Sequence, residues 1–344
     1  MKYEDRYLET TIYSMFKGKS YDYKTIREGE IFLSYPKCFN DPFDCAIFID
    51  KKAFEREFLI IKLGADLVAK IHFDDIMEKM HFYEQCKQFV PNVPLPEDFA
   101  IFDTFQASNL RLECDELYKK YVEALNDIKN EYGVACFTTN KPENNMVMWA
   151  HYANNYKGFC CEFEIDFYNI GHEHDIKNTY RFAPYFSNVD YDIFSENNFI
   201  DVVKLLSCKP DDLKFDTYVR EFIEASFYKK HKQWEYENEY RLVINKNNNS
   251  FEKTLETPKG FRIKFPYLSK VYIHSDHIKY KNGIKNISNK LNKEIICLRE
   301  SPQCEKLVED KTLTHKYNDH RTLTKILNGY NETQILSTKD DLPF

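Results

Sequence analysis

The segment 134–165 constrains the fold more than any other part of the sequence. It begins with apolar, β-prone residues, passes through a polar turn into a short amphipathic stretch, and returns to apolar residues after Gly158. This order predicts a strand, a helix and a second strand. The helix carries Trp149, His151 and Tyr152, so polar and aromatic side chains are expected on a helix held between two strands.

The ends of this helix are also predicted by residue type. Asn144 or Asn145 stands at the beginning, where a side chain can accept hydrogen bonds from the first free backbone amides. Gly158 follows the end and suits a left-handed C-terminal turn. We expect these two signals to fix the directions in which His151 and Tyr152 point.

A second polar and aromatic cluster, residues 229–241, reads KKHKQWEYENEYR. The chain has only two tryptophans, and one stands in each of these two clusters. Polar and aromatic residues concentrated in separate segments are typical of a composite site. We therefore expect Asn40, His151 and residues 234–241 to line one cleft.

Glu235, Glu237, Glu239 and Arg241 alternate within this second cluster. If a strand already begins here, all four side chains lie on one face. Three neighbouring carboxylates repel one another, which raises the pKa of at least one of them unless a cation or a ligand neutralises it. The pattern fits either a catalytic glutamate with its partner or a solvated, salt-bridged edge. We expect Glu239 to be the more buried glutamate and to be held by Arg241 or by Lys229 or Lys230.

Two other positions allow two interpretations each. His151, next to Trp149 in the sequence pattern, is either a hydrogen-bonded core residue or a catalytic residue. Asn40 and Asp41 precede Pro42, which favours extended or turn backbone. These two side chains either hydrogen-bond a ribose or amide of a ligand or shape the turn.

The whole pattern predicts one α+β domain over residues 1–325, with a helical insertion at about 51–130 and a polar tail at 326–344. Apart from the 134–165 unit, the expected strands are 9–16, 30–34, 241–244, 261–265, 270–274 and 294–298, and the expected helices are 21–28, 51–90, 105–130, 218–230 and 284–291. Helices inserted among short strands favour the α+β class.

Composition excludes several classes of protein. With 43% hydrophobic and 30% charged residues, the chain is typical of a soluble globular protein. It has neither an apolar run of membrane-spanning length nor a basic start followed by an apolar stretch, so we expect a cytoplasmic protein without a membrane span. The ten cysteines form no CxxC pair, which favours free thiols and gives no sign of a metal site.

Three motifs in this order resemble the bacterial family catalogued as domain of unknown function 2971 (DUF2971). They are FNDPFD at 39–44, CFTTN followed by MWAHYANNYKGFCCEFE within 136–164, and KKHKQWEYENEYRLV at 229–243. The resemblance covers roughly residues 10–300.

The early strands, the late Glu-x-Glu before an apolar strand and the mixed α+β content also resemble a divergent ADP-ribosyltransferase fold, with split mixed sheets and inserted helices. Proteins of that class hold NAD between two small sheets, and a late glutamate stabilises the oxocarbenium-like transition state. The resemblance implies this role for Glu239, with Glu237 nearer the acceptor. Tyr13 and Ser34 would hold NAD, and Tyr13 stands where the class usually has Arg or His.

The resemblance therefore implies an NAD-dependent ADP-ribosyltransferase or NAD glycohydrolase, acting in bacterial conflict or phage defence. NAD is the substrate, no metal is needed, and the acceptor is an unknown protein or nucleic acid. The expected catalytic side chains are Glu239, Glu237 and His151, and the side chains expected to bind NAD are Tyr13, Ser34, Asn40, Asp41, Trp149, Tyr152, Trp234 and Arg241, of which the aromatic ones can stack on nicotinamide or adenine.

Two other functions stay open at this point. The protein is alternatively a non-catalytic ligand-sensing or partner-binding module, in which the same residues tie helices to a sheet. A nuclease would need carboxylates such as Asp41, Asp44 and Glu239 around a divalent cation, and no spacing demands this. Consumption of NAD distinguishes catalysis from the binding module, and sensitivity to EDTA tests the nuclease.

Overall fold

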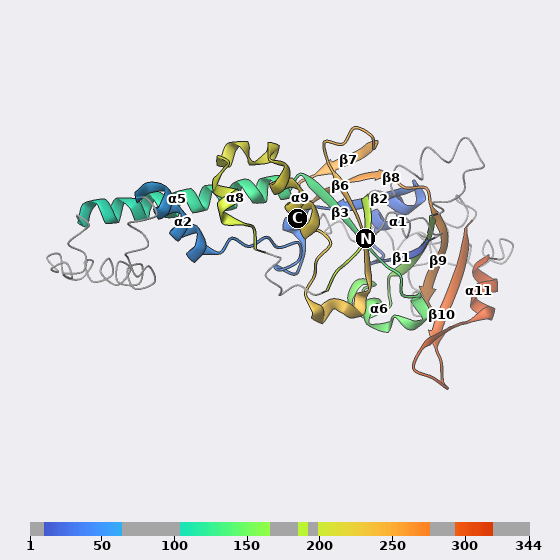
Figure 1. Ribbon diagram of the computed structural model, residues 1–344. Coiled ribbons are helices and arrows are strands. Elements are labelled where there is room, and N and C mark those ends of the chain that lie inside the picture. Colours follow the sequence, from blue (N-terminus) through green and yellow to red (C-terminus); the bar gives the residue numbers. More distant parts are fainter. Residues whose placement is uncertain (1–9, 64–103, 166–184, 192–198, 276–292, 319–344) are drawn as a thin grey trace, which may run out of the picture. The chain divides into compact units, whose positions relative to one another are not determined.

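The computed structural model describes residues 10–63, 104–165, 185–191, 199–275 and 293–318 (Figure 1). The chain divides into two compact units. The sheet unit comprises Met1–Ser34, Gly133–Val189 and Trp234–Phe344, and the helical unit comprises Tyr35–Tyr132 and Asp190–Gln233.

Among the described residues, an 11-stranded mixed sheet forms the sheet unit. Its strands are β1 (Thr10–Phe16), β2 (Glu30–Ser34), β3 (Tyr132–Thr138), β4 (Phe159–Ile165), β5 (Phe186–Asn188), β6 (Glu239–Asn245), β7 (Lys253–Thr257), β8 (Gly260–Lys264), β9 (Leu268–His274), β10 (Glu294–Glu300) and β11 (Leu307–Glu309). They follow the order β11-β10-β9-β4-β1-β3-β2-β8-β7, and β6 pairs with β3 and β5. β9 and β10 are parallel, whereas β1 is antiparallel to both β3 and β4.

Short helices accompany this sheet: α1 (Ser20–Arg27), η4 (Pro142–Asn144), α6 (Met146–Tyr152), η8 (Lys232–Glu237) and α11 (Lys311–Asn318). α11 lies alongside β10 (Figure 1), where the Asn318 side chain bonds both the amide and the carbonyl of Ile295. The helical unit contains η2 (Pro36–Cys38), α2 (Lys51–Leu63), α5 (Thr104–Lys129), α8 (Val202–Leu206), η7 (Pro210–Phe215) and α9 (Thr217–Ser226).

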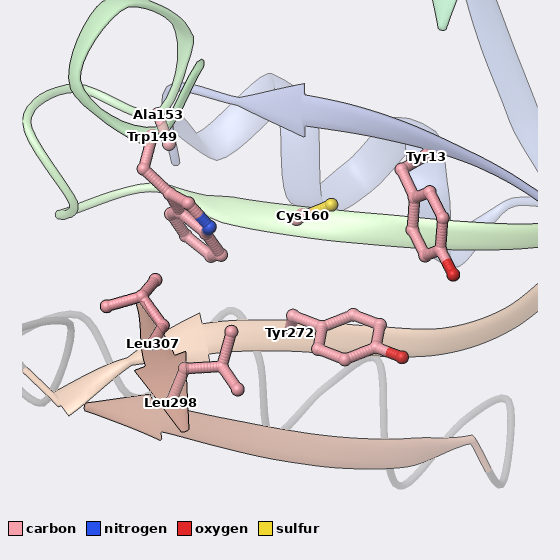
Figure 2. Packing of buried hydrophobic residues seen from close by; sticks show 7 residues of the cluster. All are labelled: Tyr13, Trp149, Ala153, Cys160, Tyr272, Leu298 and Leu307. Atoms are coloured by element: carbon pink, nitrogen blue, oxygen red, sulfur yellow. The ribbon is translucent and has the colours of Figure 1, made fainter. Parts of the chain in front are cut away.

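Trp149 anchors α6 to one face of the sheet. Its side chain is fully buried with Tyr13, Cys160 and Tyr272 from neighbouring strands, together with two leucines of β10 and β11 (Figure 2). The indole N–H donates to the carbonyl of Pro142 at 2.9 Å, which satisfies its single polar group. Because this ring is fixed, the following residues of α6 are fixed too.

The α+β class is confirmed, and so are the predicted strands and helices that lie among the described residues. Two strands of the sheet, β5 and β11, were not predicted. Each has only three residues, which is too short for an alternation of apolar and polar residues to show. The expected helix 51–90 begins as α2, which ends at Leu63. The rest of that range, the helix 284–291 and the tail 326–344 lie outside the described residues, and the ADP-ribosyltransferase-like arrangement and the single-domain boundary stay predictions.

The predicted ends of α6 are in the right places, but the expected capping is wrong. Asn145 occupies the N-cap position without a side-chain capping bond. The left-handed residues after the helix are Asn154, Asn155 and Tyr156, with φ of 50°, 50° and 65°. Gly158 serves a different purpose, because a Cβ there would lie 1.9 Å from a backbone oxygen of β1.

We predict that Gly158→Ala strongly destabilises the sheet unit. The added methyl group collides with backbone that cannot move without disturbing β1, so the loss in free energy of unfolding should reach about 3 kcal/mol or more. Urea denaturation measures it. Gly29→Ala is the matched control: Gly29 has φ +62°, but its added Cβ would have no neighbour closer than 3.8 Å, so backbone strain alone should cost about 1–2 kcal/mol. Equal losses in the two variants would contradict the argument.

Candidate functional site

Three charged side chains are buried at the beginning of β6. Glu237 is 1% exposed, Glu239 5% and Arg241 0%. Removing a charge from water costs several kcal/mol unless the charge is paired and hydrogen-bonded. The contacts of these side chains therefore determine whether this part of the chain can fold.

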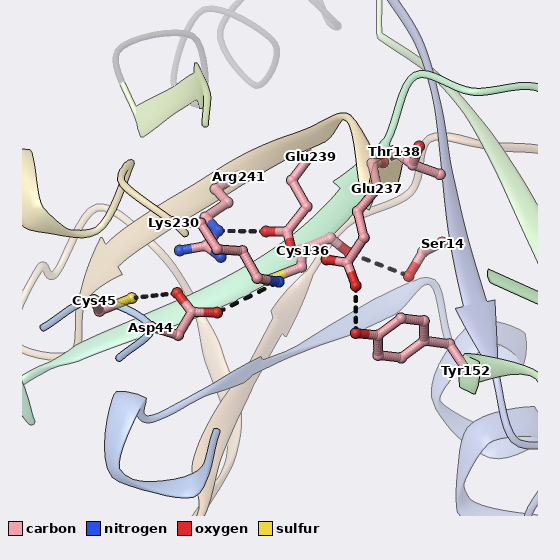
Figure 3. Close-up of polar contacts among 10 residues, drawn as sticks. All are labelled: Ser14, Asp44, Cys45, Cys136, Thr138, Tyr152, Lys230, Glu237, Glu239 and Arg241. Carbon is pink, nitrogen blue, oxygen red and sulfur yellow. Dashed lines mark hydrogen bonds and ion pairs between the residues drawn. The ribbon is translucent and has the colours of Figure 1, made fainter. Parts of the chain in front are cut away.

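Glu239 and Arg241 form a buried ion pair. They are two residues apart on β6 and so project from the same face of the strand. Arg241 Nε donates to Glu239 Oε2 at 2.5 Å (Figure 3). This contact confirms the predicted pairing, while the predicted order of burial is wrong, because Glu237 is buried slightly more deeply than Glu239.

Glu237 is held from two sides. The phenol of Tyr152, the last residue of α6, donates to Glu237 Oε1 at 2.6 Å (Figure 3). The Thr138 hydroxyl, at the end of β3, donates to the backbone carbonyl of Glu237 at 2.7 Å. A short hydrogen bond to an ionised carboxylate is stronger than one between neutral groups, so the carboxylate has a fixed position between helix and sheet.

The prediction that four alternating side chains share one strand face is wrong. The strand begins only at Glu239, and Glu235 is exposed on the 3-10 helix η8. Asn238 separates the two elements with a left-handed backbone, φ 45°. Asparagine tolerates this conformation better than most residues, and the Asn238 amide is held by the hydroxyl of Thr139.

His151 is exposed, so its interpretation as a core histidine is wrong. Trp149 and His151 are two residues apart on α6, so their side chains point in directions that differ by about 200° around the helix axis. Trp149 points into the core, and His151 therefore points outward. His151 Nδ1 lies 3.3 Å from the hydroxyl of Tyr236. The end of α6 therefore meets the end of η8, as the composite-site prediction required, and the ring of Trp234 lies 6.1 Å from that of Tyr236. The role of Tyr236 was not predicted, because nothing in the residue pattern distinguishes it from the chain's other tyrosines.

The other residues expected to bind NAD in the sheet unit are placed differently. Trp149 is fully buried, so its predicted stacking on a ligand is contradicted. Tyr13 is also buried, at 4% exposure. Tyr13 pairs with Thr138 and Ser34 with Val134, four positions apart on β3, which places them about 13 Å apart along that strand. Tyr13 and Ser34 are therefore not brought together.

Tyr13 instead belongs to a buried polar cluster around Glu162, which sits opposite it on β4. Glu162 accepts hydrogen bonds from Tyr272 at 2.6 Å, Lys270 at 2.9 Å and Ser269 at 3.1 Å. Burial raises the pKa of Glu162, but the hydrogen bonds from Tyr272 and Lys270 outweigh it and hold that pKa below its usual value. Burial and the neighbouring carboxylate raise the pKa of both phenols.

The loop that follows β2 lies in the helical unit. Asn40 is exposed, and Asp41 accepts a hydrogen bond from the backbone amide of Phe43 at 2.9 Å, as the turn interpretation predicts. Nearby, buried Asp44 lies 3.6 Å from Lys230 Nζ (Figure 3). The prediction that Asn40 lines a cleft with His151 stays a prediction.

Two further findings concern the described residues only. They contain no group of three or more His, Cys, Asp or Glu side chains arranged to hold a metal ion. None of their helices has both the length and the apolar character needed to cross a membrane.

Comparison with known proteins identifies a family. Residues 148–242 match the model of the family described as "Protein of unknown function (DUF2971)". The matched segment contains Tyr152 and Glu237, whose side chains meet in the site, and the match supports the family resemblance that the three motifs predicted. No curated protein and no solved structure matches the chain.

We predict that Glu239→Gln destabilises the protein by about 3–5 kcal/mol, because it leaves the buried guanidinium of Arg241 without its counter-charge. The double variant Glu239→Gln/Arg241→Met should recover most of this loss, since no unpaired charge then remains. A double-mutant cycle by urea denaturation measures the coupling. Additive losses in the cycle would contradict a coupled ion pair.

We also predict a pH dependence from Glu162. Its pKa is lower in the folded state, so its contribution to stability is present above the unfolded-state pKa and is lost as the pH falls through the folded-state pKa. Glu162→Gln should therefore cost about 2–3 kcal/mol at neutral pH, and the difference from wild type should shrink in acid. Glu164→Gln, at an exposed position of the same strand, should change little. A pH-independent difference for Glu162→Gln would contradict the assignment.

Proposed function

We propose that the protein cleaves the bond between nicotinamide and ribose in NAD and transfers ADP-ribose to water or to an acceptor. Breaking this bond places positive charge on the ribose, so a fixed carboxylate favours the transition state over the neutral ring of the ground state. The observation that supports the proposal most is the buried carboxylate of Glu237, positioned by Tyr152 directly beside the exposed contact of His151 with Tyr236.

We assign the stabilising role to Glu237. The charge of Glu239 is balanced within a buried pair by the cation Arg241, which weakens its effect on a second positive charge. Tyr152 orients Glu237 by a 2.6 Å hydrogen bond, beside the exposed contact of His151 with Tyr236. This assignment differs from the one that the resemblance implies, in which Glu239 stabilises the transition state. Here Glu237 faces the reacting ribose, and Glu239 holds the start of β6.

The aromatic side chains near Glu237 suit the two rings of NAD. Trp234 is partly exposed and Tyr236 is 38% exposed, so both have surface to offer a nicotinamide or adenine ring. They take the stacking role that burial denies to Trp149. The proposed setting in bacterial conflict or phage defence, with a protein or nucleic acid as acceptor, is supported by the family resemblance alone.

A non-catalytic binding module is the second candidate, and one observation favours it. The buried charges of Glu237, Glu239 and Arg241 are all engaged by side chains of the protein itself, and these contacts tie α6 and η8 to the sheet. In that case the cluster would serve stability and the recognition of a partner. Substitutions in it would change stability without any effect on NAD.

The test is incubation of the purified protein with NAD labelled in the ADP-ribose part, with and without cell extract as a source of acceptors. We expect release of free nicotinamide and formation of a labelled product. Glu237→Gln keeps the shape of the side chain but not its charge, and should lower the rate about 100- to 1000-fold. Glu235→Gln, on the exposed side of the same 3-10 helix, is the matched control and should keep the wild-type rate.

Thermal unfolding with and without NAD accompanies this assay. Glu237→Gln should still unfold cooperatively, and NAD should raise the unfolding temperature of both proteins. If the wild type releases no nicotinamide, forms no labelled product and shows no thermal shift with NAD, the proposal is wrong and the binding module is favoured.

A further inference from the structure

Two adjacent contacts join the end of α6 to the end of η8. Tyr152 meets Glu237 through a 2.6 Å hydrogen bond, and its neighbour His151 meets Tyr236 at 3.3 Å. The inner contact is the buried one, since Glu237 is 1% exposed, whereas His151 is exposed. The two contacts are adjacent on each element: His151 precedes Tyr152 on α6, and Tyr236 precedes Glu237 on η8. The buried carboxylate of Glu237 therefore lies next to the contact made by the exposed imidazole of His151.

The outer contact is held from both ends. The backbone carbonyl of Tyr236 accepts a hydrogen bond from the side chain of Asn140 at 3.0 Å. On the other side, α6 is fixed by the buried ring of Trp149. The rings of His151 and Tyr236 meet edge to face, with centroids 6.3 Å apart. The imidazole therefore has a defined orientation although it is exposed.

The contact also distinguishes the two nitrogens of His151. A neutral imidazole has one N–H donor and one acceptor nitrogen. When Nδ1–H donates to the hydroxyl of Tyr236, Nε2 carries the lone pair and can accept a proton. The hydroxyl of Tyr236 can donate or accept, so the contact holds the ring at Nδ1 and leaves Nε2 outside it.

We infer that His151 is the general base for the attacking oxygen, and that Tyr236 is the positioning residue that holds the imidazole ring through Nδ1. This inference rests on the proposed function. The bond from ribose C1′ to the nicotinamide nitrogen breaks, and its electron pair leaves with nicotinamide. The oxygen of water or of an acceptor hydroxyl forms the new bond to C1′, and its proton passes to Nε2 of His151.

The placement divides the work between two sides of the reacting carbon. Glu237, below, stabilises the positive charge of the ribose, and His151, at the surface, acts on the acceptor that arrives from solvent. Among the described residues, ring contacts place two phenols at His151, that of Tyr152 on its own helix and that of Tyr236 on η8. A change of rate with pH that disappears in His151 variants and persists without the Tyr236 hydroxyl therefore belongs to the imidazole.

The experiment is the pH profile of nicotinamide release by the full-length protein at fixed NAD. The wild-type rate should rise with pH along one limb, because a general base must lose its proton before it can accept another. His151→Ala and His151→Gln should both lose this limb and about 100-fold or more in rate above it. Added imidazole should restore part of the activity of His151→Ala. Tyr236→Phe should keep the limb with a smaller loss of rate, because the base remains but its ring is no longer held at Nδ1.

His315→Ala is the control, since His315 is an exposed histidine on α11, and it should match the wild type. If the wild type cleaves NAD and the His151 variants keep its rate and its pH limb, the inference is overturned while the proposed function stands. If Tyr236→Phe matches the wild type in rate and profile, Tyr236 has no positioning role. The wild type is measured first. If it releases no nicotinamide, the proposed function itself is overturned.

Discussion

The burial of two carboxylates two residues apart is the constraint on which the site depends. Glu237 and Glu239 would repel each other and oppose folding if both were left without partners. Arg241 balances one charge from within the same strand, and Tyr152 holds the other from the end of α6. The second contact exists only because α6 has a fixed position on the sheet, which Trp149 secures.

This arrangement gives the two glutamates different work. A carboxylate that is already paired with a buried cation contributes to stability, and its loss exposes the cost of an isolated charge. The carboxylate of Glu237 is held in its direction by the phenol of Tyr152, and a positioned carboxylate is what a developing cation requires. The proposed reaction therefore assigns Glu237 to chemistry and Glu239 to the architecture that presents it.

Much of the fold follows from the sequence because its longer elements have a clear period. The strand–helix–strand unit, β1 with α1 and β2, and the meeting of the two polar clusters were all predicted from residue patterns. The expected strand 241–244 begins two residues later than β6, and the alternation considered from Glu235 onward is interrupted by the left-handed backbone of Asn238. The cluster at Glu162 was missed for another reason: Tyr272, one of its donors, is 110 residues away along the chain, and only strand pairing brings the two together. Trp149 and His151 illustrate the same limit, since both are polar aromatic residues and only the packing of α6 decides which one is buried.

The most direct test of the central claim is a crystal structure of the Glu237→Gln variant soaked with NAD. Because the variant should bind NAD without cleaving it, the account predicts intact NAD with the nicotinamide ribose within hydrogen-bonding distance of side chain 237. It also predicts an aromatic ring of the ligand against Trp234 or Tyr236. NAD bound elsewhere on the protein, or no NAD at a concentration that saturates the wild type, would contradict the account.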